Sequence, residues 1–391
     1  MWTEAVGVPD TATPGGQQPV EVSKEMTTTV TDLDDLRRRM TEWLGARVGA
    51  PVQVGELSRP TEGGMSSISL LFDATWAVDG VPTTHALVAR MPPDATAFPV
   101  FPGYDLRGQY DVIAAVGAHS DVPLPPLYWL EESPDALGAP FIVMGRVDGR
   151  VPVDNPPYVF GGWFFDATAD ERLGLQEATL DVLARLHAIE SPSVVFPALA
   201  ERAGDDALRR HVDEQRAYYE WTRREDALRI PIIEETFAWL EQHWPADVGE
   251  PVLSWGDARI GNVIFDGFTP AAVLDWEMAA VAPREVDLAW YLYIHRFFQD
   301  LAEQFEQPGL PDVAHRSDVI AAYEKASGYT VRDFDWYVLY ATLRYAIVMS
   351  QVTRRMIHFG EAQVPATPDD YVMFHPTMRA MIDGTYDWRK K

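Results

Sequence analysis

The chain has 391 residues, 47% of them hydrophobic and 23% charged, which is typical of a folded globular protein. At ~150 residues per domain, this length predicts two or three domains. The 59 acidic and 32 basic side chains give a net charge of −27, which disfavours nucleic acid and anionic membranes as partners. The sequence contains no cysteine, so disulfides and thiolate metal sites are excluded and a reducing, cytoplasmic location is expected.

Neither the N-terminus nor the longest apolar run has the features of a targeting or membrane-spanning segment. The N-terminal residues MWTEAVGVPD lack the basic stretch and long apolar core of a signal peptide. The longest apolar run, residues 336–349, carries Arg344 and is shorter than a membrane span, so we expect a buried helix there. The sequence therefore predicts a protein that is neither secreted nor embedded in a membrane.

The N-terminal part combines helical and strand patterns. Residues 1–30 are rich in Pro, Gly, Thr and Gln, and we expect a disordered tail. Apolar residues then recur at helical spacing from Leu33 to Leu44, which predicts a helix. Hydrophobic and polar residues alternate over 68–78, and a second apolar run follows a turn near Gly80, so an antiparallel hairpin is expected.

Further elements divide the chain into two lobes. A helix over 106–118 and strands at LYWL and PFIVM complete an N-terminal α+β lobe, residues 31–147. Beyond the loop VPVDNPPYVFGG, residues 148–391 are predicted to form a mainly helical C-terminal lobe. Its clearest helical patterns lie near residues 175–189, 237–244 and 288–298.

One segment of the C-terminal lobe breaks the helical pattern and carries candidate chemistry. Short apolar runs at 263–265 and 271–274 flank a turn, which predicts a small hairpin. Asp257 and Asn262 precede its first strand and Asp275 follows its second. Because a hairpin returns the chain to the side where it started, these three oxygen-bearing side chains are expected to converge.

The spacing of these residues favours phosphoryl transfer. Asp-x4-Asn followed by an Asp at a strand end is the arrangement of protein kinases. We therefore expect Asp257 to accept the proton of an attacking hydroxyl, while Asn262 and Asp275 hold Mg²⁺ against the phosphates of ATP. A hydrolytic zinc site is disfavoured because no histidine lies nearby.

The motifs WGDARIGNVIF, AAVLDWE and PREVDLAW resemble the aminoglycoside phosphotransferase family, in which HGDxxxxN precedes a strand, LDWE and D-L-A-W. The motifs GMSS, LGAPF and VMGRVDG are similar to an actinobacterial phosphotransferase branch. The resemblance extends over residues 50–360. It implies a protein-kinase-like fold of two lobes, ATP bound between them, and transfer of phosphate to a small-molecule hydroxyl.

The resemblance assigns further residues. It places the base at Asp257, the metal ligands at Asn262 and Asp275, and a brace of the catalytic loop at Asp287, which also suits the N-terminus of a helix. Trp255 stands where the family commonly has histidine. We expect an aromatic packing role there that leaves the chemistry of the base intact.

The expected nucleotide contacts in the N-terminal lobe are less typical of kinases. A turn containing Gly63, Gly64, Ser66 and Ser67 could cover the phosphates of ATP with backbone N–H groups and hydroxyls. Arg90 lies at a strand end, where kinases place a phosphate-binding lysine.

The helix that should carry an ion-pair partner for this cation offers Gln109, which has no charge. This departure and Trp255 together keep a second interpretation open, a nucleotide-binding pseudokinase without transfer activity. A structural or lipid-binding helical protein is a third. For an active enzyme, the candidate acceptors are an aminoglycoside, another antibiotic, a sugar, an amino alcohol or a hydroxyacyl thioester.

Overall fold

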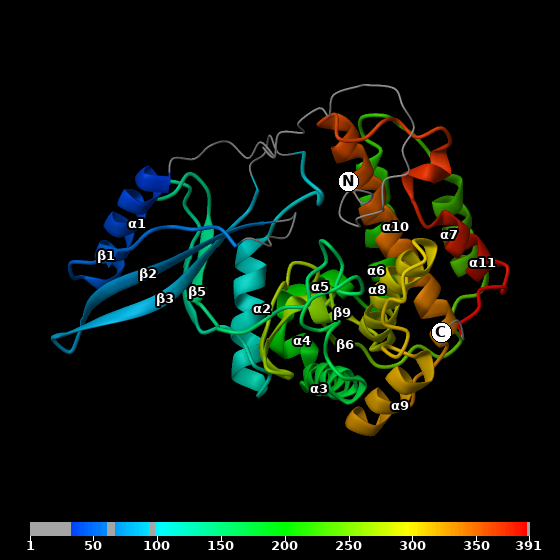
Figure 1. The fold of residues 1–391 in the computed structure, drawn as a ribbon, viewed down its shortest axis with the longest axis horizontal. Coiled ribbons are helices and arrows are strands. Elements are labelled where there is room, and N and C mark those ends of the chain that lie inside the picture. The colour runs from blue at the N-terminus through cyan, green and yellow to red at the C-terminus, as the bar shows by residue number, and fades with distance from the viewer. Residues whose placement is uncertain (1–32, 61–66, 94–97, 389–391) are drawn as a thin grey trace, which may run out of the picture.

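The computed structural model describes residues 33–60, 67–93 and 98–388, so the tail expected at 1–30 lies outside it. The chain folds into two lobes, a smaller lobe built on a sheet and a larger helical lobe (Figure 1). This arrangement confirms the α+β class. Within the described ranges, none of the helices combines the length and apolar character that a membrane span requires.

The smaller lobe is an antiparallel sheet of five strands in the order β1-β2-β3-β5-β4. Its strands are β1 (Gln53–Val54), β2 (Ile68–Val78), β3 (Val81–Met91), β4 (Leu127–Glu131) and β5 (Phe141–Gly145). The predicted hairpin is confirmed, with Ser69 opposite Arg90 across β2 and β3. On its other side Arg90 pairs with Ile142 of β5, so the arginine is held by a central strand.

Two helices flank this sheet. Helix α1 (Leu33–Val48) buries Leu36, Met40 and Leu44 in the apolar cluster of the sheet. Helix α2 (Leu106–His119) contacts the sheet through Leu106, while Val112 and other apolar residues of α2 pack into the core of the larger lobe. Helix α2 therefore joins the two cores, as its position between the lobes suggests (Figure 1).

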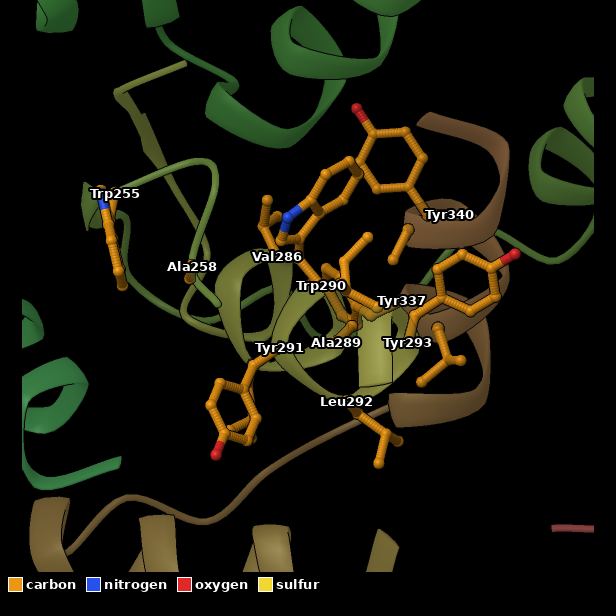
Figure 2. Packing of buried hydrophobic residues seen from close by; sticks show 14 of the residues in the cluster. Trp255, Ala258, Val286, Ala289, Trp290, Tyr291, Leu292, Tyr293, Tyr337 and Tyr340 are labelled. Carbon is orange, nitrogen blue, oxygen red and sulfur yellow. The ribbon is translucent and has the colours of Figure 1, made fainter. Parts of the chain in front are cut away.

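The larger lobe is mainly helical. Its α-helices are α3 (Ala169–His187), α4 (Pro192–Val195), α5 (Pro197–Ala203), α6 (Ala207–Thr222), α7 (Pro231–Gln242), α8 (Glu285–Gln304), α9 (Arg316–Ser327), α10 (Phe334–His358) and α11 (His375–Ile382). Helices α8 and α10 form the centre of its core. Aromatic side chains such as Trp290 of α8 project toward α10, which carries Tyr337 and Tyr340 (Figure 2).

Helix α10 is longer than the apolar run that predicted it. Arg354 and Arg355, which follow the apolar run in the sequence, lie inside its last turns. The difference arises because tertiary partners accommodate charge within the helix. Arg354 is largely buried and bonds the carboxylate of Asp226 at 2.7 Å.

Two small antiparallel sheets interrupt the helices. Strands β7 (Val263–Asp266) and β8 (Thr269–Val273) form the predicted hairpin, and β6 (Val252–Ser254) pairs with β9 (Ala280–Ala282). The second pairing was not predicted from sequence. It encloses the hairpin and brings both ends of the 252–282 segment together.

A second connection between the lobes lies in the link from β3 to α2. Residues 98–104, which we call the strap, precede α2 and contact the larger lobe. The consecutive backbone carbonyls of residues 98–100 accept hydrogen bonds at 3.2, 2.8 and 2.8 Å from the side chains of Arg355, Gln351 and Tyr218. The strap is thereby anchored to α10 and α6 of the larger lobe.

Candidate active site

The candidate catalytic loop begins with a turn that requires glycine. Gly256 has φ of +91°, a left-handed value that side chains disfavour. A Cβ added there would also collide with the backbone carbonyl of Met278. Glycine thus lets the chain leave β6 and pass directly beneath the segment that follows Asp275.

Asp287, in the first turn of α8, holds this turn in place. Its buried carboxylate accepts hydrogen bonds from Ser254 Oγ at 2.7 Å, from the backbone N–H groups of Trp255 and Gly256 at 2.6 and 2.9 Å, and from His187 Nε2 at 3.2 Å. Burial alone would raise the pKa of Asp287, but the bonds from His187, Ser254 and Gly256 outweigh it and lower that pKa. Two of the partners are backbone groups of the loop itself, so the carboxylate fixes the loop's conformation.

Asp257 lies next along the loop and accepts hydrogen bonds from three side chains. Asn262 Nδ2 approaches one carboxylate oxygen at 2.6 Å, Trp290 Nε1 approaches the other at 2.7 Å, and Arg259 Nε lies 3.0 Å from both. The Arg259 guanidinium also bonds Asp154. Burial would lower the pKa of Arg259, but the charges of Asp257 and Asp154 outweigh it and raise that pKa. Arg259 is therefore a permanent cation in direct contact with the Asp257 carboxylate.

Asp275 follows β8 in a strained conformation. Its φ of +62° is left-handed, which costs a non-glycine residue ~1–3 kcal/mol and is found mostly at functional sites. The carboxylate accepts a 2.7 Å hydrogen bond from Arg90 of the other lobe. Hairpin pairing continues beside it, since Leu274 N donates to Asn262 O at 2.8 Å. The segments carrying Asn262 and Asp275 are thus adjacent, as the hairpin predicted.

Arg90 has two carboxylates as partners, and neither comes from α2. Besides Asp275, it lies 3.5 Å from Glu277 Oε2, and all three side chains are at least four-fifths buried. Burial would lower the pKa of Arg90, whereas Asp275 and Glu277 outweigh it and raise that pKa. Among the described residues, Gln109 makes no hydrogen bond to Arg90. The charge expected from α2 is thus supplied by the segment after β8.

A cavity between the lobes has the composition of a nucleotide site. Its polar lining includes Arg90, Gln109 and Asp275, and its apolar lining includes Ile142, Met144 and Val273. Apolar walls from both lobes suit a planar base, and Arg90 at one end suits a phosphate. The residues present therefore fit ATP in composition and charge.

The donor set near this cavity also fits a hard cation. Asn262 uses its amide nitrogen toward Asp257, which leaves its amide oxygen out of that contact, and Asp275 supplies a carboxylate. Mg²⁺ prefers a few such oxygens together with water and phosphates. Of the predicted glycine turn, Ser67 directly precedes β2, while Gly63, Gly64 and Ser66 lie outside the described residues.

A second cavity is lined in part by Arg259, whose guanidinium also contacts Asp257. Polar side chains of Asp154, Tyr158, Arg259 and His295 line it together with apolar residues of α8 and its neighbours. The hydroxyl oxygen of Tyr158 and Nδ1 of His295 are 2.9 Å apart, and His295 Nε2 lies 3.3 Å from the carbonyl oxygen of Leu310. Burial lowers the pKa of His295 to about 3, so this imidazole is neutral at neutral pH.

Several residues that contact Asp257, Arg259 or Arg90 were not predicted from the sequence as part of this site. Arg259 lies within the motif itself, and its place two residues after Asp257 was the available signal. Glu277 lies two residues after Asp275 in the same way. Trp290 lies in the motif PREVDLAW, but its contact with Asp257 joins positions 33 residues apart, and Asp154 comes from a distant segment that gave no local signal. Trp255 takes the expected packing role, since it is buried and its Nε1 donates to the carbonyl of Leu274 at 2.8 Å.

Curated relatives share part of this chain. A protein of Arabidopsis thaliana named probable acyl-CoA dehydrogenase IBR3 is 24% identical over 264 residues, covering 64% of this chain and 31% of the relative. Acyl-CoA dehydrogenase family member 11 of Gallus gallus is 30% identical over 213 residues, covering 53% of this chain and 25% of the relative. The chain thus spans about a third or less of the length of these relatives.

Solved structures share the fold over most of the chain. A protein of Ralstonia eutropha assigned as an aminoglycoside phosphotransferase has a TM-score of 0.62 at 20% identity, covering 89% of this chain and 97% of its own. The ethanolamine kinase of Plasmodium vivax has a TM-score of 0.53 at 11% identity, covering 83% and 82%. The two-lobed fold is therefore that of protein-kinase-like phosphotransferases. The model of the phosphotransferase enzyme family matches residues 73–325, well over half of the sequence. The chain belongs to this family.

Proposed function

We propose that this protein is an ATP- and Mg²⁺-dependent phosphotransferase that acts on a hydroxyl group of a small molecule. The observation that carries the proposal is the convergence of Asp257 and Asn262 on one loop with Asp275, which meets Arg90 across the inter-lobe cavity. Family membership supports the same reaction class.

In this proposal Asp257 acts as the base. It takes the proton of the acceptor hydroxyl as the oxygen attacks the γ-phosphorus of ATP, and the bond from that phosphorus to the β–γ bridging oxygen breaks, giving a phosphate ester and ADP. Trp290 and Asn262 hold the carboxylate in place, and Arg259 bonds both of its oxygens.

Asn262 and Asp275 are the residues that would hold Mg²⁺, and Arg90 is placed to contact the phosphates. When bound, the metal neutralises phosphate charge. Such neutralisation matters in this chain because its net charge is −27. We place Gly63, Gly64, Ser66 and Ser67 over the phosphates, as the sequence predicts.

The second cavity, which Arg259 connects to Asp257, is the proposed acceptor site. Its lining joins polar groups near Asp154 and Arg259 to apolar residues including Ile260, Ile294 and Val313. Asp154, the carboxylate among its described lining residues, is already paired with Arg259, which disfavours a polycationic aminoglycoside. An acceptor with an apolar arm, such as a hydroxyacyl thioester, fits this lining better. The relatives named as acyl-CoA dehydrogenases point to the same class.

The test is acceptor-dependent release of ADP, with mass analysis of products over a panel of hydroxyacyl thioesters, amino alcohols, sugars and aminoglycosides. Asp257→Asn should lower turnover by about 10²-fold or more and keep the rise in Tm that ATP and Mg²⁺ produce. Asp266→Asn, an exposed acid of the same hairpin, is the matched control and should keep activity.

Three outcomes would count against the proposal. Undiminished turnover in Asp257→Asn would refute the role of the base. Stabilisation by nucleotide without ADP release for any acceptor would instead identify the pseudokinase. Absence of any stabilisation by nucleotide would favour a structural protein.

A further inference from the structure

Arg344 of α10 is an unusual residue for the core of a lobe. It is 1% exposed, and no carboxylate among the described residues forms a salt bridge with it. Its Nε and one terminal nitrogen are buried without a hydrogen-bond partner in the same set of residues. A buried arginine without a carboxylate partner destabilises a fold, since desolvation of its charge is not offset. Packing alone does not explain a guanidinium at this position.

The contacts that Arg344 does make both lead to Asp257. Its remaining terminal nitrogen donates a 3.0 Å hydrogen bond to the carbonyl of Gly256, the residue directly before Asp257. Its guanidinium also lies over the indole of Trp290, 4.4 Å from the ring centroid. Trp290 in turn donates to Asp257 at 2.7 Å. Figure 2 shows Trp290 extending from α8 toward α10, the helix that carries Arg344.

The charges around Arg344 are consistent with this placement. Burial lowers the pKa of Arg344, while Tyr340 and then the negative charges of Asp287 and Asp257 act in the opposite direction. The backbone N–H of Gly256 donates to Asp287, and the backbone carbonyl of Gly256 accepts from Arg344. The two polar backbone groups of this residue are therefore held by side chains of opposite charge.

We infer that Arg344 is a positioning residue for phosphoryl transfer, which fixes the Gly256 carbonyl and the Trp290 indole so that the Asp257 carboxylate is held in its reactive orientation. The inference rests on the proposed role of Asp257 as the base. It links the C-terminal helix α10 to the catalytic loop and adds a residue that does not touch substrate.

The test replaces Arg344 with methionine, which has a similar apolar length without charge or donors. Arg344→Met should lower kcat by about 10-fold to 10²-fold, because small misplacements of a catalytic group have effects of this size. The KM for ATP should stay within twofold. The Tm should equal or exceed that of the wild type, because an uncompensated buried charge is removed.

Arg354→Met is the matched control on the same helix. Arg354 is also buried, but its partner Asp226 lies outside the active site. Its replacement should lower Tm, because Asp226 loses its partner, and leave kcat within twofold. Arg344→Lys keeps the charge and a donor group without the planar fork of the guanidinium, and it should recover part of kcat.

A readout without activity separates this inference from the proposed function. Amide hydrogen exchange over residues 254–265 should be faster in Arg344→Met and unchanged in Arg354→Met. This comparison holds even if no acceptor is found. A kcat within twofold of wild type in Arg344→Met, or unchanged exchange in that segment, would overturn the inference. Equal losses of kcat in both methionine variants would also overturn it.

Discussion

The carboxylate of Asp287 accepts hydrogen bonds from four different residues, and its removal should strongly destabilise the fold. Its two oxygens accept four hydrogen bonds, from Ser254, Trp255, Gly256 and His187. The side chain is completely buried. In Asp287→Asn one oxygen becomes an NH₂ group, which has to face donors instead of accepting from them.

The magnitude follows from the number of bonds affected. Removing one member of a buried charged network destabilises by ~3–5 kcal/mol. For a lobe of roughly 200 residues, each kcal/mol lowers Tm by ~2–4 °C, so Asp287→Asn should lower Tm by roughly 6–20 °C. Phosphotransfer should fall as well, because Gly256 and therefore Asp257 lose their support.

The stability difference should also depend on pH. The pKa of Asp287 is lowered in the fold from an unfolded value of about 3.9. A carboxylate with a depressed pKa contributes stability above its unfolded pKa, and this contribution is lost as pH falls through its folded pKa. The difference in free energy of unfolding between wild type and Asp287→Asn should therefore be constant from about pH 5 to pH 7. This difference should become smaller below about pH 4.

Urea unfolding followed by circular dichroism at several pH values measures this difference. Asp247→Asn is the control, since Asp247 forms an exposed ion pair with Arg332. Such a pair contributes ~1 kcal/mol or less. The reasoning is refuted if Asp287→Asn changes the free energy of unfolding no more than Asp247→Asn, or if the difference becomes larger in acid.

Two further substitutions test the nucleotide cavity and the loop. Glu277→Gln should raise the Kd for ATP by about tenfold, because Arg90 loses one of its two carboxylates, and adding Gln109→Glu should restore binding, since residue 109 lines the same cavity. Calorimetric titration measures both, and an unchanged Kd in Glu277→Gln contradicts this role. Gly256→Ala should destabilise by roughly 2–5 kcal/mol, combining left-handed backbone with a steric clash. Gly174→Ala, in open space on α3, should instead stabilise by about 1 kcal/mol in the same denaturation assay, and equal effects would refute the argument.

Local patterns predicted the parts of the fold that depend on neighbours in sequence. The β7–β8 hairpin was predicted because a turn at Asp266 separates two apolar runs, and the contact between Asp257 and Asn262 follows from their short separation. The pairing of β6 with β9 was missed because both strands have three residues and the hairpin lies between them. Such short strands carry too few residues for an alternating pattern.

The electrostatic partners were harder to predict for a physical reason. The sequence identified Gln109 as an uncharged residue where kinases carry a glutamate, but not that Glu277 would lie near Arg90 instead. An ion pair across two lobes depends on their relative placement, which no spacing in the sequence encodes. The same holds for Arg344, whose apolar surroundings predicted a buried helix but not its contact with Gly256.

The strap described above affects how the two lobes can move. The chain passes between the lobes once after β5, and residues 98–100 provide a second point of attachment through three side-chain hydrogen bonds. Because these bonds tie the chain just before α2 to α10 and α6, and α2 itself packs into the larger core, we expect the start of α2 to stay with the larger lobe when the two lobes move relative to one another.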